Sequence, residues 1–118
     1  MEYNRVVQTV VEMPGYLKTA ETIFTETERE RIVAMVAAEP DCGEVMQGTG
    51  GFRKVRVGRS GMGKRGGARV IYILGGDDYP IFLFAAYAKN EKDNLTKKER
   101  NALAKRAVEI FATYRGVA

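Results

Sequence analysis

The sequence contains no histidine and no tryptophan, and a single cysteine, Cys42, among its 118 residues. Without histidine, the commonest general base is missing, together with every catalytic triad that depends on it. One cysteine cannot form an internal disulfide, and no cysteine–histidine cluster exists that could hold zinc. Any catalysis must therefore use other side chains, and we expect neither a metal nor another cofactor.

Long hydrophobic segments are also absent. The longest uninterrupted apolar run, from Ile81 to Ala88, has 8 residues, whereas a membrane-spanning helix needs about 20. The first residues, MEYNRVVQTVVEMPGY, lack the basic start and continuous apolar stretch of a signal peptide. The length suits one domain covering 1–118, and we expect a soluble, cytoplasmic protein with no membrane partner.

The charge is distributed unevenly along the chain. Residues 1–44 hold 4 basic and 9 acidic residues, and residues 77–118 hold 8 basic and 6 acidic residues. Residues 45–76 hold 7 basic residues and no acid, for a net charge of +7. Cations that face one another repel, so a polyanion is the natural partner for such a segment. The simpler alternative is a solvated basic hairpin without a ligand.

Local signals predict four strands and three helices. Capping boxes at Thr25-x-x-Glu28 and Thr96-x-x-Glu99, together with Pro14, indicate where helices begin. Runs of β-branched and alternating residues indicate the strands. The predicted order is β-α-α-β-β-β-α, with strands at 5–11, 52–57, 68–74 and 80–88 and helices at 14–24, 25–39 and 96–114. Residues 59–67, RSGMGKRGG, are predicted to form a flexible basic loop.

This element order predicts an α+β fold. The last three strands form an antiparallel meander, and the first strand joins the sheet at an edge or beside the last strand. The last helix is expected to turn one apolar stripe to the core, formed by Leu103, Ala107, Ile110, Phe111 and Tyr114. The helices are expected to pack on one side of the sheet only, which leaves a cationic face for a ligand.

Cations and one tyrosine are the remaining candidates for chemistry. By alternation, Lys54 and Arg56 share one face of their strand, and Arg69 begins the next strand. Tyr87 and Lys89 lie at the end of the last strand, and a meander can bring Tyr87 near the three cations. The simpler alternatives are a surface salt bridge for Arg69 and a core position for Tyr87.

Such a group of side chains suits RNA. Arginine pairs with phosphate through two parallel hydrogen bonds, and a lysine among other cations loses its proton more easily and can act as a general base. RNA carries its own nucleophile, the 2′-hydroxyl, so removal of that proton yields a 2′,3′-cyclic phosphate without a metal. Cations would stabilise the extra negative charge, and an aromatic ring such as that of Tyr87 could stack on a base.

The run GTGGFRKVRVGRSGMGKRGGARVIYIL, followed by IFLFAAYAKNEKDNLTKKERNALAKRAVEIF, resembles the RelE/HigB superfamily of bacterial toxins. It is most similar to the HigB-like branch, which has a long basic hairpin loop and a Tyr-x-Lys-x-x-Lys stretch before the last helix. The resemblance implies a RelE-like fold and an mRNA endoribonuclease, or mRNA interferase. Such a toxin of a type II toxin–antitoxin system cuts mRNA, typically on the ribosome, and inhibits translation. It also implies a cognate antitoxin, expected to be of helix-turn-helix type.

The resemblance also implies roles for single residues. Lys54 and Arg56 match the paired cations of the second strand, one of which is the base, and Arg69 matches an arginine that clamps the phosphate. The predicted catalytic residues are Lys54, Arg56, Arg69, Tyr87 and Lys89, and the predicted RNA-binding residues are Arg53, Arg59, Lys64, Arg65 and Lys92.

Two other functions fit the same sequence. In a non-catalytic RNA- or ribosome-binding module that blocks translation, the same cations would only contact phosphates. In an interaction protein, the basic face would only dock an acidic partner. The antitoxin could bind in two ways: a segment of it could add to a sheet edge, or a helix of it could cover the core elements. The sequence does not choose between these two modes.

Overall fold

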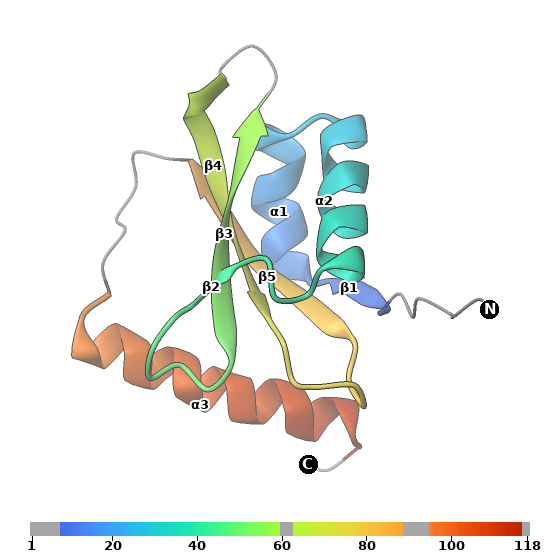
Figure 1. The fold of residues 1–118 in the computed structure, drawn as a ribbon. Helices are drawn as coiled ribbons and strands as arrows, with labels where there is room; N and C mark the ends of the chain where they lie inside the picture. The colour runs from blue at the N-terminus through green and yellow to red at the C-terminus, as the bar shows by residue number, and fades with distance from the viewer. Residues whose placement is uncertain (1–7, 60–62, 89–94, 117–118) are drawn as a thin grey trace, which may run out of the picture.

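The computed structural model describes residues 8–59, 63–88 and 95–116. Within these ranges, it describes the backbone but not the side chains of residues 59 and 63–66. Three helices flank a five-stranded sheet (Figure 1). The elements in chain order are β1 (Val10–Glu12), α1 (Pro14–Ile23), α2 (Glu26–Ala38), β2 (Glu44–Val45), β3 (Phe52–Arg59), β4 (Gly63–Ile73), β5 (Ile81–Ala88) and α3 (Lys97–Tyr114). No helix in the described part of the chain is long and apolar enough to cross a membrane.

The helix ends form where the local signals predict them. The Thr25 hydroxyl accepts a hydrogen bond from the Glu28 amide at 3.1 Å, and the Glu28 carboxylate accepts one from the Thr25 amide at 2.8 Å. Thr96 and Glu99 repeat this reciprocal arrangement at the start of α3. Each capping box satisfies two amides that the helix itself leaves without partners. Both predicted capping boxes are therefore confirmed.

The strand order is β1-β5-β4-β3-β2, and the predicted antiparallel meander of β3, β4 and β5 is confirmed. Strand β1 lies at an edge beside β5 and runs parallel to it. It begins at Val10, while residues 5–7 of the predicted first strand lie outside the described residues. The prediction missed β2, which pairs only Glu44 and Val45 with β3, because two residues carry no alternation.

The prediction of a loop over residues 59–67 is wrong at residue 59 and over 63–67, and its central residues 60–62 lie outside the described residues. Strand β3 continues to Arg59 and β4 begins at Gly63, and these two residues pair after a register shift that follows Val57. Glycine weakens a strand but keeps its backbone donor and acceptor, so both strands extend into the glycine-rich run, where Arg59 and Gly63 form one further pair. The basic hairpin is therefore longer than the composition predicts, with an irregular register beyond Val57.

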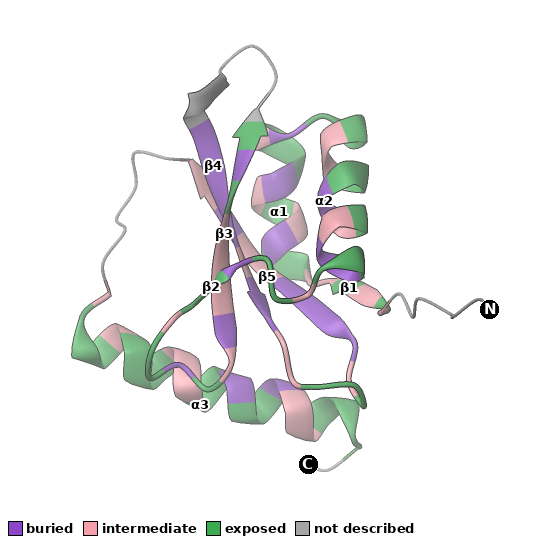
Figure 2. Ribbon diagram, in the orientation of Figure 1, coloured by how far each residue is buried: buried purple, intermediate pink, exposed green. Residues whose placement is uncertain are grey.

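One face of the sheet packs against α1 and α2. Val57, Val70 and Leu83, from three neighbouring strands, form a core with Tyr16 of α1 and Val36 of α2. Figure 2 shows buried residues along β4 and β5 and on the inward sides of both helices. We call this side of the sheet the α1/α2 face.

The opposite face is covered in part by α3, so the prediction that helices pack on one side only is wrong. Phe52, Ile73 and Phe82 would leave a large apolar surface in water, and they pack instead with Ala107 and Ile110. The predicted stripe of α3 is confirmed except at Tyr114, which is 53% exposed. Figure 1 shows α3 lying across one end of the sheet, and we call this side the α3 face.

Candidate functional site

A row of polar side chains crosses the α3 face beyond the helix. Arg56 of β3 is the direct partner of Arg69 on β4, and Arg69 is the direct partner of Tyr87 on β5. Residues directly opposite on neighbouring strands place their side chains on the same face, about 5 Å apart at Cβ. Lys54 lies two residues before Arg56 on that face. The structure therefore brings together four of the five predicted catalytic residues, which we call the cationic row.

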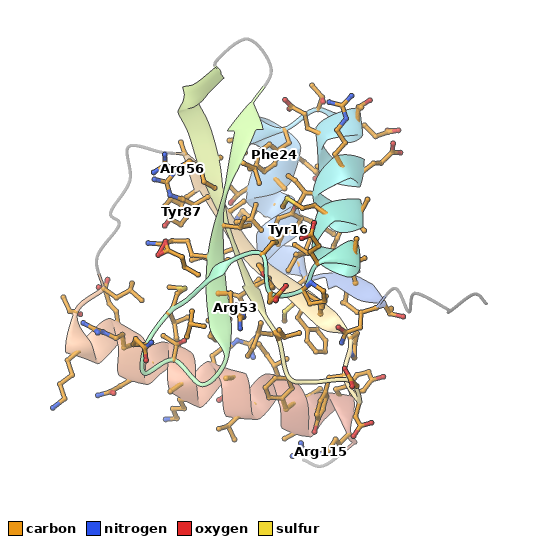
Figure 3. All side chains as sticks on the ribbon, viewed as in Figure 1. Tyr16, Phe24, Arg53, Arg56, Tyr87 and Arg115 are labelled. Carbon is orange, nitrogen blue, oxygen red and sulfur yellow. The ribbon has the colours of Figure 1, made fainter. Side chains whose placement is uncertain are left out.

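Burial differs along the cationic row. Arg69, in the centre, is only 5% exposed, Lys54 and Tyr87 are half-buried, and Arg56 is exposed. Figure 3 shows Arg56 and Tyr87 on the side of the sheet away from Tyr16. Two arginines directly opposite each other repel, and an anion held between them relieves that repulsion. The row thus presents an exposed cation beside a firmly positioned one, as a phosphate group requires.

Arg53, a predicted RNA-binding residue, does not join this row. Arg53 points to the α1/α2 face, where its guanidinium donates to the backbone carbonyls of Gly43 at 2.8 Å and Asp41 at 3.3 Å. It ties the segment before β2 to β3. Lys89 and Lys92 lie outside the described residues, as do the side chains of Arg59, Lys64 and Arg65, whose backbones belong to β3 and β4.

One residue near the row was missed by the sequence analysis. Glu44 of β2 is the direct partner of Lys54, so a carboxylate lies opposite this lysine on the α3 face. The two residues line a pocket of about 270 Å³ with Val45, Met46, Gln47, Leu95 and Arg100. Glu44 is the last acid before the acid-free segment, but only the pairing of β2 with β3 brings it to Lys54.

Two tyrosines with shifted pKa values lie on the α1/α2 face, away from the cationic row. Burial raises the pKa of Tyr16 to about 12, with a smaller contribution from the Glu12 carboxylate. Burial also raises the pKa of Tyr72, and a hydrogen bond with Cys42 adds to the shift. The Tyr72 hydroxyl donates to the Pro40 carbonyl at 2.6 Å and accepts from the Gly43 amide at 2.8 Å. These shifts report core positions, not catalysis.

A larger hollow, of about 650 Å³, lies between α2 and β3. Ile32 and Met35 of α2 and Val57 of β3 are its apolar lining, Glu28 and Arg31 are charged residues of the α2 side, and Arg56 borders it on β3. Because β2 pairs only with Arg53 and Lys54, the described part of β3 beyond them forms an edge of the sheet here. The hollow therefore adjoins both the cationic row and a free strand edge.

Comparison with known proteins agrees with this architecture. Residues 43–116 match the family described as the RelE toxin of the RelE/RelB toxin–antitoxin system. This range includes the cationic row and Glu44. A mutant of the E. coli toxin RelE in the free state is similar in structure, with a TM-score of 0.51 and 17% sequence identity over 88% of this chain and 97% of that chain. The family match does not separate the HigB-like branch, which stays a prediction. The chain belongs to the RelE family of toxins of toxin–antitoxin systems.

Proposed function

We propose that this RelE-family toxin is an endoribonuclease that cuts mRNA on the ribosome and thereby stops translation. The observation that carries the proposal is the cationic row, in which Arg56, Arg69 and Tyr87 are consecutive cross-strand partners. Three rigid strands hold these side chains in register, and a site on strands is positioned more firmly than one on loops. Two arginines that are direct cross-strand partners on one face can both donate to a single phosphate of single-stranded RNA.

The reaction uses the 2′-hydroxyl of the substrate as nucleophile. A general base removes the hydroxyl proton while O2′ forms a bond to phosphorus, and the bond from phosphorus to O5′ breaks. The leaving oxygen takes up a proton, so the products are a 2′,3′-cyclic phosphate and a 5′-hydroxyl. The pentavalent phosphorane carries one more negative charge than the ground state, and positioned cations lower the barrier by stabilising that charge.

The residues of the row take different parts in this reaction. Arg69 is held in the sheet and binds the phosphate, and the exposed Arg56 joins it as the phosphorane forms. Lys54, on the same face, is the group that exchanges a proton with the substrate. The ring of Tyr87 stacks on a base beside the cut and fixes the sugar between the two arginines.

The test is to induce the toxin without its antitoxin and map new 5′ ends of cellular mRNA by primer extension. Wild type should produce codon-phased ends within minutes. Arg56→Ala should reduce their appearance about 100-fold, the cost of removing one group that stabilises transition-state charge. Because Arg56 is exposed, this variant should keep its fold. Lys18→Ala removes an exposed cation from α1, behind the opposite face, and should cut like wild type.

The same experiment can reject the proposal. Stalled but intact mRNA in cells that stop growing would show a non-catalytic ribosome-binding module. Equal cleavage by wild type and Arg56→Ala would remove the row from the chemistry. Purified toxin incubated with free mRNA and with mRNA on ribosomes then tests the ribosome dependence, which predicts cutting only in the second case.

The cognate antitoxin is proposed to bind along the free edge of β3. The hollow between α2 and β3 offers Ile32, Met35 and Val57 to apolar side chains, while the edge offers backbone hydrogen bonds to an added strand. Because Arg56 of β3 borders the same hollow, an occupant there would also lie beside the cationic row. Of the two binding modes, these features support strand addition.

A further inference from the structure

The pocket beside Lys54 has two walls from distant parts of the chain. One wall is β2 and the turn after it, with Glu44, Val45, Met46 and Gln47. The other is Leu95 and the first turn of α3, where Arg100 lies. Lys54 lines the side that leads to the cationic row. A volume of about 270 Å³ suits a fragment the size of one nucleobase, since pockets for larger ligands begin at about 300 Å³.

The first wall is rigid. The Met46 amide donates to the Phe52 carbonyl at 2.9 Å, and the buried Thr49 hydroxyl donates to the Met46 carbonyl at 2.6 Å. Gly50 has a positive φ of 78°, and a methyl group there would lie 3.2 Å from Cβ of Ala107 on α3. The turn is therefore held between the sheet and α3, and a ligand meets a preformed surface.

Arg100 connects the two walls. Its Nη2 donates to the Leu95 carbonyl at 3.1 Å, and its Cδ lies 3.7 Å from the position that a Cβ on Gly48 would take. The capping box of Thr96 fixes the helix turn from which Arg100 projects. A guanidinium held in this way offers a flat surface on which an unstacked RNA base can lie.

We propose that this pocket binds the nucleobase next to the cleaved phosphate and selects guanine through Glu44. An ionised carboxylate only accepts hydrogen bonds. Guanine places two adjacent donors, N1–H and the N2 amino group, on its Watson–Crick edge. Adenine and cytosine place an acceptor beside their amino group there, and uracil has one N–H between two carbonyls. The inference rests on the proposed nuclease function, because it is the cationic row that places RNA beside the pocket.

The remaining lining fits a purine. The Gln47 amide can donate to guanine O6 while Glu44 accepts from N1 and N2, and Met46 and Leu95 give apolar contact to the base. Lys54 stands opposite Glu44 and reaches from the pocket to the row. Lys54 thus lies between Glu44, which recognises the base, and the arginines of the cationic row, which bind the phosphate.

The first experiment maps cleavage sites for wild type and for Glu44→Gln, which keeps the shape of the side chain and removes one acceptor. Wild type should show guanine enriched at one fixed position relative to the cut. The variant should lose that enrichment by about 10- to 100-fold, the discrimination of a bidentate contact to a base edge. Glu21→Gln changes an exposed acid on α1, on the other side of the sheet, and should keep the wild-type profile.

The second experiment does not need cleavage. GMP should shift the NMR signals of the Gln47 side-chain amide and the Gly48 amide in wild type, AMP should shift them at least tenfold less, and Glu44→Gln should remove the difference. Arg100→Ala should weaken GMP binding, while Lys105→Ala, an exposed change further along α3, should not.

The two experiments separate the two proposals. A GMP-specific shift in a protein that cuts no RNA would support the pocket and reject the nuclease. Cleavage with the same base profile in wild type and Glu44→Gln would support the nuclease and overturn the pocket, as would equal shifts by GMP and AMP.

Discussion

At the scale of single residues, two buried tyrosines of the α1/α2 face use their hydroxyls differently. Tyr72 joins the Pro40 carbonyl to the Gly43 amide and so closes the turn that leads into β2. The Tyr16 hydroxyl is buried with no hydrogen-bond partner among the residues that the structure describes. A tyrosine with its ordinary pKa of about 10 already keeps its proton at neutral pH. Burial raises the pKa of both residues further, so each hydroxyl stays protonated in mildly alkaline solution as well.

Replacing each tyrosine by phenylalanine tests this difference. Tyr72→Phe should lower the free energy of unfolding by about 1–3 kcal/mol, because it leaves the buried Gly43 amide and the partly buried Pro40 carbonyl without their partner. Tyr16→Phe is the matched control and should leave the free energy unchanged or raise it, because it removes a buried polar group. Urea denaturation measures both. Equal losses in the two variants would contradict the assignment.

At the scale of elements, the position of α3 depends on a close approach of the chain. Gly75, in the turn after β4, faces Phe111 so closely that a methyl group would overlap the ring. Phe111 also packs against Tyr79, with ring centroids 4.7 Å apart. This turn and helix together cover Phe82 and so close the core of the α3 face.

Gly75→Ala should therefore loosen α3. Overpacking of this kind costs about 1–3 kcal/mol, and the shifted helix should become a better protease substrate. Gly58→Ala is the control, since a methyl group on Gly58 would meet nothing within 4 Å. Thermal unfolding and limited proteolysis measure both variants. Proteolysis of α3 at the same rate in both would show that the contact with Phe111 does not hold the helix.

Elements with local signals were predictable, and those that depend on distant partners were not. Thr25, Thr96 and Pro14 fixed helix starts because a capping residue acts within its own turn. The glycine-rich part of β4 looked like a loop because glycine lowers strand propensity, whereas its pairing with β3 decided the outcome. The face that α3 covers follows from Phe52, Ile73 and Phe82 together, from three strands.

At the scale of the whole molecule, the residues of the cationic row could be predicted from the sequence, whereas Glu44 could not. Here too, the difference is between local patterns and contacts with distant parts of the chain. Alternation placed Lys54 and Arg56 on one face, and the meander brought Arg69 and Tyr87 beside them. Glu44 could not be found in this way, because its pairing with Lys54 depends on the path of the chain from α2 into β2. The α3 face is thus basic across the strands and carries one carboxylate, that of Glu44, in the pocket beside Lys54.

This layout predicts how RNA binding responds to salt. For single-stranded RNA, each phosphate contact contributes about −0.7 to the slope of log K against log salt concentration. Arg56 lies in the row and is exposed, so Arg56→Ala should make the slope shallower by about 0.7. Lys18→Ala removes the same charge from α1, behind the opposite face, and should leave the slope unchanged. Fluorescence anisotropy measures the slopes with a 2′-O-methyl RNA, which lacks the 2′-hydroxyl nucleophile and so cannot be cut.

The outcome distinguishes two ways of attracting RNA. If both variants change the slope equally, the net charge of the molecule attracts RNA and the row does not position it. A change in Arg56→Ala alone shows that a phosphate lies on the row, where the chemistry requires it.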